Sequence, residues 1–100
     1  MVEISSIETK NIKIDGEDAV GVRVDLKGAP LLLIIAPKGY VMCGYLNLET
    51  AEKFGQVAAI VTGVKSFDDV LRTKIVKLTM KAKELEIKEG MAGGWTRRFK

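Results

Sequence analysis

The chain begins with two segments in which apolar and polar residues alternate. Ile12 and Ile14 are separated by a polar residue, and every second residue of the segment Val20–Leu26 is apolar. The pair Asp15-Gly16 lies between the two segments. A period of two is typical of strands, and Asp-Gly is a preferred hairpin turn. The pattern therefore predicts an N-terminal antiparallel hairpin in which each strand has one buried face and one polar face.

Two further strands are expected next. Residues Leu31 to Ala36 form an uninterrupted apolar run, and Pro37-Lys38-Gly39 ends it. An unbroken apolar run of this length is consistent with a strand that is buried on both faces. The turn sends the chain back into Tyr40 to Leu46, so the two runs most simply pair as a hairpin at the centre of the sheet.

Two short helices are marked by their capping residues. Asn47 is a candidate N-cap for a helix of about two turns, and Gly55 suits the position after its end. Ser66 and Asp69 have the spacing of a capping box, which predicts a second short helix. The apolar run Val57–Thr62, which lies between the two helices, predicts another buried strand.

The C-terminal third contains a longer helical pattern and an aromatic tail. Ile75, Leu78, Ala82 and Leu85 recur at helical spacing beside a stripe of lysines, which predicts an amphipathic helix. The segment Trp95–Lys100 combines aromatic and basic side chains after a glycine-rich stretch. It either docks on its own or a sister chain, which we favour, or binds an acidic partner such as RNA.

Together these elements predict an α+β fold, with a mostly antiparallel sheet, an N-terminal β-hairpin and two to three short helices packed on it. The 100 residues, 47% hydrophobic and 29% charged, suit a single domain. Within it we expect an N-terminal β region over about residues 1–36, a strand–helix–strand–helix core over 37–91 and a C-terminal tail over 92–100. On folding, a chain of this length buries less than about 70% of the surface that its unfolded form exposes. Pairing with copies of itself is therefore expected to add stability.

The residue content narrows the possible chemistry. The chain has one cysteine and no histidine, which rules out an internal disulfide, a Ser-His-Asp triad and a Cys-His pair. We therefore expect no metal site and no cofactor. No apolar run approaches the about 18 residues that span a bilayer, and the first residues do not resemble a signal peptide. The expectation is a cytoplasmic protein that does not associate with membranes.

The net charge of +3 is unevenly distributed along the chain. Residues 1–71 carry 7 basic and 10 acidic side chains, whereas residues 72–100 carry 9 basic and 3 acidic ones. A basic C-terminal third can attract nucleic acid or an acidic protein, or it can be a solvated helix face. We favour the solvated face because no aromatic stacking pattern runs through residues 72–88, and nucleic-acid binding is kept as an alternative.

The candidate ligand site lies where two apolar strands lead into capped helices. If the strands that flank the first helix are parallel neighbours, the segments that follow them lie side by side. Backbone N–H groups at the two helix starts would then face a small anionic ligand. The candidate binding residues are Gly44, Asn47, Gly63, Lys65 and Ser66. The alternative is that the two glycines only permit tight strand exits and that the lysine projects into water.

Cys43 is the candidate for nucleophilic or redox chemistry. A thiol near a helix N-terminus or a lysine can have a lowered pKa, which would suit a thiol-dependent enzyme or a redox sensor. However, Cys43 lies in an apolar run, and no general base is visible in the sequence. An inert core cysteine is the favoured interpretation, and whether the protein is an enzyme stays open.

Several segments resemble the YunC-like family of small bacterial and archaeal proteins. The similar segments are Gly39–Asn47, Ala51–Gly55, Ala58–Lys65 and Phe67–Leu71, and the most specific parts are Cys-Gly-Tyr-Leu and Val-Thr-Gly-Val-Lys. The resemblance covers about residues 15–91. It implies an α+β domain of unknown function whose N-terminal β region forms a homo-oligomer, with a tetramer favoured, and it implies no reaction, substrate or cofactor. The chain departs from the family pattern at Gly93-Gly94-Trp95. We expect an oligomeric structural or ligand-binding module.

Overall fold

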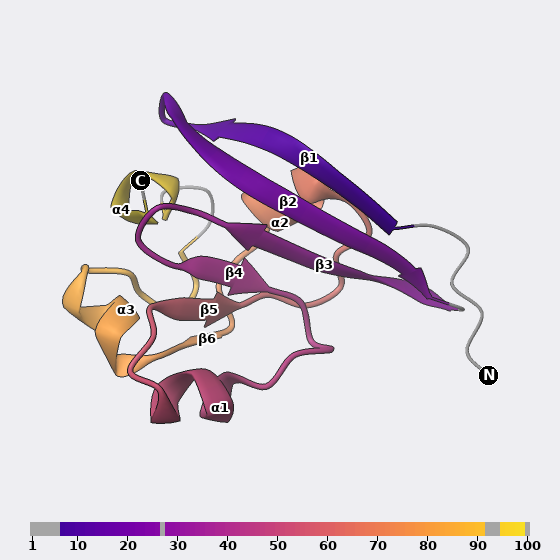
Figure 1. The fold of residues 1–100 in the computed structure, drawn as a ribbon. Coiled ribbons are helices and arrows are strands. Elements are labelled where there is room, and N and C mark those ends of the chain that lie inside the picture. The colour runs from indigo at the N-terminus through magenta and orange to yellow at the C-terminus, as the bar shows by residue number, and fades with distance from the viewer. Residues whose placement is uncertain (1–6, 27, 92–94, 100) are drawn as a thin grey trace.

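The computed structural model describes residues 7–26, 28–91 and 95–99. Six strands form one sheet in sequence order, and short helices pack against it (Figure 1). The elements are β1 (Ile7–Ile14), β2 (Glu17–Leu26), β3 (Ala29–Ile35), β4 (Tyr40–Met42), α1 (Leu48–Lys53), β5 (Ala58–Ile60), α2 (Phe67–Arg72), β6 (Lys77–Leu78), α3 (Met80–Glu84) and α4 (Thr96–Phe99). Neighbouring strands are antiparallel except β4 and β5, which are parallel. The predicted α+β fold is therefore confirmed.

Both predicted hairpins are present. In the first, Asp15 has a φ of 48° and Gly16 a φ of 84°, the left-handed conformations that a type I′ turn requires. Ile14 pairs with Glu17 directly beyond this turn, so the turn sets the register of β1 against β2. The second hairpin pairs β3 with β4, and β4 is shorter than the apolar run that predicted it.

The two predicted caps are also confirmed. The side chain of Asn47 accepts a hydrogen bond from the N–H of Glu49 at 2.8 Å and begins α1. The hydroxyl of Ser66 accepts from the N–H of Asp69 at 3.1 Å and begins α2. Each cap pairs a backbone donor that lacks a partner in the first helical turn. These local interactions explain why both helices begin where the sequence predicts.

The amphipathic helix predicted from Ile75 to Leu85 is wrong. The chain there forms β6, which pairs with β5, and then the short helix α3. Thr79 separates the two because its buried hydroxyl donates to the carbonyl of Gln56 at 2.7 Å and accepts from the N–H groups of Ala58 and Ala82 at 3.2 and 3.3 Å. Pairing with a distant strand has overridden the local helical pattern.

The main core lies on one face of the sheet and a smaller core on the other. Alternate residues of β3 and β4, such as Ile34 and Val41, join α2, α3 and the C-terminal aromatic residues in the main core. On the opposite face, Met42 packs with α1. Trp95 and Phe99 are fully buried with ring centroids 5.5 Å apart, so the described part of the tail docks on the protein's own core. Residues 92–94 and 100 of the predicted tail lie outside the described residues.

The strand β2 turns its valines away from the main core, contrary to the expectation that the apolar side of its alternation is buried. Gly21 faces α2 instead, because a Cβ at this position would lie 2.8 Å from the ring of Phe67. Val20, on the other side of the strand, is 46% exposed. The expectation that β3 is buried on both faces also fails in the single chain, since Ile35 is 44% exposed.

The hydroxyl of Thr79 generates a stability prediction. Replacing Thr79 by valine keeps the shape of the side chain but leaves the buried N–H groups of Ala58 and Ala82 without this acceptor. We expect Thr79→Val to lower the free energy of unfolding by about 2 kcal/mol in urea denaturation. Thr79→Ser keeps the hydroxyl and should lose clearly less. Equal losses in the two variants would show that the hydroxyl is not what stabilises this junction.

Candidate functional site

The carboxyl ends of β4 and β5 meet at one edge of the sheet, where the chain leaves toward opposite faces. α1 follows β4 and packs against Met42 and Ala58, whereas α2 follows β5 and packs on the other face against β3. Adjacent parallel strands whose connections diverge in this way leave a crevice, and ligands of open α/β sheets bind in such crevices. The parallel pairing required by the predicted site is therefore present.

A pocket of about 330 Å³ opens at this crevice, and we call it the strand-end pocket. Its walls come from the start of β3 and from the segments that follow β4 and β5. The lining residues are Ala29, Pro30, Cys43, Gly44, Tyr45, Thr62, Gly63, Val64 and Lys65. Most of these side chains are small or apolar, and Lys65 is the one charged residue among them.

The backbone of Lys65 is held from two sides. Its N–H donates to Asp69 Oδ2 at 3.0 Å, and its carbonyl accepts a hydrogen bond from Arg23 Nη1 at 2.8 Å. Gly63, with a φ of 71°, allows the sharp turn that the chain makes after β5. These contacts orient the peptide from which the Lys65 side chain extends, and Lys65 itself is exposed.

The structure brings together three of the five predicted ligand-binding residues. Gly44, Gly63 and Lys65 all line the strand-end pocket. Asn47 borders a neighbouring cavity of about 540 Å³ beside α1, which Gly44 also lines. Ser66 lines neither cavity. The predicted site is thus divided between a pocket and two capping residues.

The backbone donors that line the pocket lie before the helices rather than in their first turns. α1 and α2 have six residues each, and their capping side chains already accept from the N–H groups of Glu49 and Asp69. Within the part of the chain that the structure describes, the N–H groups of Gly44 and Gly63 donate no hydrogen bond. Both glycines line the pocket, and no residue of α1 or α2 is among its described lining residues, so the glycines rather than the helix starts offer donors there.

Cys43 lies in the wall of the pocket but is only 4% exposed. Its Sγ accepts a hydrogen bond from the N–H of Leu32 at 3.3 Å. Among the described residues that line the pocket, none carries a carboxylate or an imidazole that would act as a general base. This geometry favours the interpretation of Cys43 as a core residue over that of a nucleophile.

Sequence reasoning missed Tyr45 and Thr62, which place hydroxyl groups at the pocket. The hydroxyl of Tyr45 donates to the carbonyl of Ala29 at 3.3 Å and so links two of the walls. Tyr45 and Thr62 are each next to a glycine of the predicted site in the sequence, and this adjacency could have identified them as lining residues. Ala29 and Pro30 gave no such signal, because they reach the pocket only through the pairing of β3 with its neighbours.

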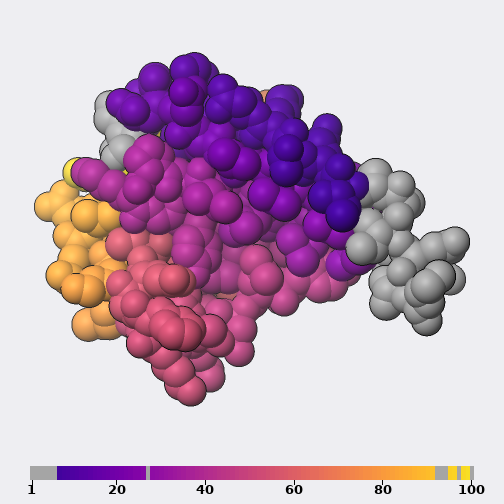
Figure 2. All heavy atoms as spheres, in the orientation of Figure 1, coloured from indigo at the N-terminus to yellow at the C-terminus, as the bar shows by residue number. Residues whose placement is uncertain are grey.

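A second candidate surface lies on the α1 side of the sheet, across the N-terminal strands and largely beyond α1, and we call it the apolar sheet face. By register it consists of three rows across β1, β2 and β3: Ile7, Val24 and Leu31; Thr9, Val22 and Leu33; Asn11, Val20 and Ile35. None of the nine is charged, and Ile7 is 65% exposed. Figure 2 shows these indigo and purple strands open to the viewer, with α1 below them. An apolar patch with an uncharged centre is typical of a protein–protein interface.

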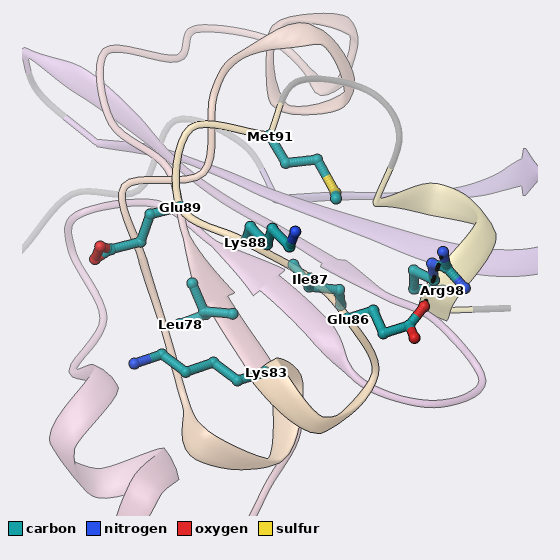
Figure 3. A pocket seen from close by; sticks show the side chains of 8 residues that line it. All are labelled: Leu78, Lys83, Glu86, Ile87, Lys88, Glu89, Met91 and Arg98. Carbon is teal, nitrogen blue, oxygen red and sulfur yellow. Dashed lines mark ion pairs between the residues drawn. The ribbon is translucent and has the colours of Figure 1, made fainter.

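A cavity of about 830 Å³ lies in the basic C-terminal third, between β6, α3 and α4. Its floor includes Leu78 and Ile87, and its rim carries basic and acidic residues in alternation (Figure 3). Glu86 pairs with Arg98 at 3.2 Å, and Lys83 and Glu89 point to the side away from this pair. The mixed signs do not form the continuous basic surface that favours nucleic-acid binding.

Within residues 7–26, 28–91 and 95–99, no three acidic, cysteine or histidine side chains gather closely enough to hold a metal ion. None of the helices described there is long and apolar enough to cross a membrane.

Comparison with known proteins identifies the family. Residues 42–94 match DUF1805, a domain of unknown function. The uncharacterized protein YunC of Bacillus subtilis is 33% identical over 86 residues, which cover 82% of this chain and 85% of that protein. The crystal structure of TA1206, a protein of unknown function from Thermoplasma acidophilum, matches with a TM-score of 0.84 and 41% identity over 88% of this chain and 86% of that one. The chain therefore belongs to the YunC-like family of DUF1805 proteins.

Proposed function

We propose that this protein is a self-associating ligand-binding module. In this proposal the strand-end pocket takes a small molecule that has an apolar body and an anionic group. The observation that carries the proposal is the position of the pocket, which opens where the chain leaves β4 and β5 toward opposite faces of the sheet. A pocket of about 330 Å³ suits a small metabolite rather than a macromolecule.

The chemistry of the walls supports this class of ligand. Pro30 and Val64 offer apolar contacts, and Thr62 offers a hydroxyl. The ammonium group of Lys65 and the free N–H of Gly63 are donors suited to a carboxylate. With one cation and no acidic residue among the described lining residues, the pocket favours a singly charged anion over a cation.

The first test uses sodium benzoate as a probe, because it joins a carboxylate to an apolar ring. We expect saturable shifts of the backbone amide signals of Gly44, Gly63 and Lys65 in a ¹⁵N NMR titration, with a dissociation constant on the order of 1 mM. Lys65→Met should weaken benzoate binding about fivefold, because it removes the exposed ion pair between the Lys65 ammonium group and the benzoate carboxylate. Lys38→Met, which removes an exposed lysine elsewhere, should leave it unchanged.

Two results would contradict the ligand proposal. One is that benzoate shifts no amide near the strand-end pocket in a saturable way. The other is that Lys65→Met and Lys38→Met behave alike, since the charge at the pocket would then have no role in binding. Benzyl alcohol serves as the matched neutral probe and should bind more weakly than benzoate to the wild-type protein.

We propose further that a second copy of the chain covers the apolar sheet face and that the copies assemble as tetramers. The nine residues of this face include seven apolar side chains and no charge. Burial of such a face is favourable by about 25 cal/mol per Å² of apolar surface. The pair Lys13–Asp18 lies at one end of the face, where a charged rim is expected.

Self-association predicts a mass near four times the 11.0 kDa of one chain in light scattering. Val20→Asp places a carboxylate on the apolar sheet face and should reduce the mass, because its burial in the interface would leave a charge unpaired. Val76→Asp is the matched control, since Val76 is 43% exposed and Val20 46% exposed. A wild-type protein that stays at the mass of one chain over a wide concentration range would contradict the proposal.

Thiol chemistry at Cys43 is the alternative function, and the burial of Sγ argues against it. We expect N-ethylmaleimide to label native Cys43 slower than a free thiol by about two orders of magnitude or more, because labelling requires local opening of the fold. The same reagent should label the urea-unfolded protein at the ordinary rate. Fast labelling of the native protein at pH 7 would instead support a thiol-dependent activity.

A further inference from the structure

Arg23 lies between the apolar sheet face and the strand-end pocket. Its neighbours Val22 and Val24 belong to the apolar sheet face, and alternation along β2 turns the Arg23 side chain to the opposite side of the sheet. This side chain is only 30% exposed. One short stretch of β2 therefore takes part in both surfaces.

The guanidinium group of Arg23 bonds both to a wall of the pocket and to a neighbour on its own strand. Nη1 donates to the carbonyl of Lys65 at 2.8 Å, and Nε donates to Asp25 Oδ1 at 2.8 Å. Asp25 in turn pairs with Pro30 across the β2–β3 ladder, and Pro30 lines the pocket. Arg23 thus ties the segment that carries the pocket's cation to the strand beside the opposite wall.

The segment that follows β5 has few other ties to the N-terminal strands. Lys65 also bonds to Asp69, but that contact lies within the same local turn, whereas Arg23 is 42 residues away in the chain. Among the described residues, the bond from Arg23 is the one hydrogen bond that joins residues 62–66 to β1 or β2. This bond is therefore the hydrogen-bonded link through which β2 can act on the segment that carries Lys65.

We infer that Arg23 is a positioning residue that couples self-association to ligand binding at the strand-end pocket. A second copy on Val22 and Val24 holds this part of β2 in place, and the bond from Arg23 then keeps Lys65 oriented toward the pocket. By linkage, an anionic ligand that needs Lys65 in this orientation favours assembly by the same factor. The inference rests on the proposed function and adds the regulation of its site.

The experiment combines two substitutions in a cycle with benzoate as the probe. In the wild-type background, dispersal of the assembly by Val20→Asp should raise the benzoate dissociation constant about fivefold. In the Arg23→Met background the same substitution should change it less than about twofold, because the link is already broken. Arg72→Met is the matched control, since it removes an exposed pair with Asp68 and should leave the fivefold effect intact.

A second readout does not depend on any ligand. The backbone nitrogen of Ser66 follows the Lys65 carbonyl, so its ¹⁵N chemical shift reports the hydrogen bond that this carbonyl accepts from Arg23. Val20→Asp should change the chemical shift of Ser66 when Arg23 is present. The same substitution should leave this shift unchanged in the Arg23→Met background. Arg23→Lys keeps the charge but loses the planar fork that reaches both partners, and it should give an intermediate shift. It also provides a milder variant if Arg23→Met fails to fold.

The outcomes separate the coupling from the ligand site. Suppose that benzoate fails to bind, but that the Ser66 signal changes with assembly only when Arg23 is present. The coupling is then supported and the ligand assignment is contradicted. If benzoate binds but neither its affinity nor the Ser66 signal changes with Val20→Asp, the coupling is overturned and the ligand assignment stands. A wild-type protein that never self-associates overturns the coupling, because no second copy then acts on β2.

Discussion

The parallel pairing of β4 with β5 is the interaction on which the rest of the structure depends. It is held by backbone hydrogen bonds such as Tyr40 N–H to the Val57 carbonyl at 3.0 Å and Val61 N–H to the Met42 carbonyl at 2.9 Å. A parallel pair needs a crossover, which α1 provides on one face, while α2 leaves β5 toward the other. The sheet is therefore covered on both faces at this pair, and a crevice opens where the two connections part.

The same arrangement explains why the N-terminal strands expose an apolar surface. α1 covers only the β4–β5 end of its face, where Leu33 packs against its core, so Val20 and Ile35 stay largely exposed in the single chain. The opposite face of β2 is shaped by α2, which leaves room for Gly21 but not for a larger residue. In this account a second copy completes the core that one chain of 100 residues leaves open.

Local patterns predicted the elements, and contacts between distant residues decided their environment. The turn at Asp15-Gly16 and the caps at Asn47 and Ser66 depend on neighbours within a few residues, so the sequence alone located them. The helix predicted through Ile75 failed because Thr79 bonds to a strand more than 20 residues earlier. For the same reason the sequence named four lining residues of the pocket, Cys43 among them, but missed Pro30 and Arg23, whose roles arise from sheet pairing and from one long-range hydrogen bond.

The most direct test of the central claim is a crystallographic screen of the wild-type protein with small carboxylates and their neutral analogues. The account predicts that bound carboxylates collect in the strand-end pocket, each with an oxygen near Lys65 or the N–H of Gly63, and that a second copy covers the apolar sheet face. Carboxylates bound only elsewhere, such as the cavity beside Arg98, would contradict it. So would a strand-end pocket that stays empty at high ligand concentration.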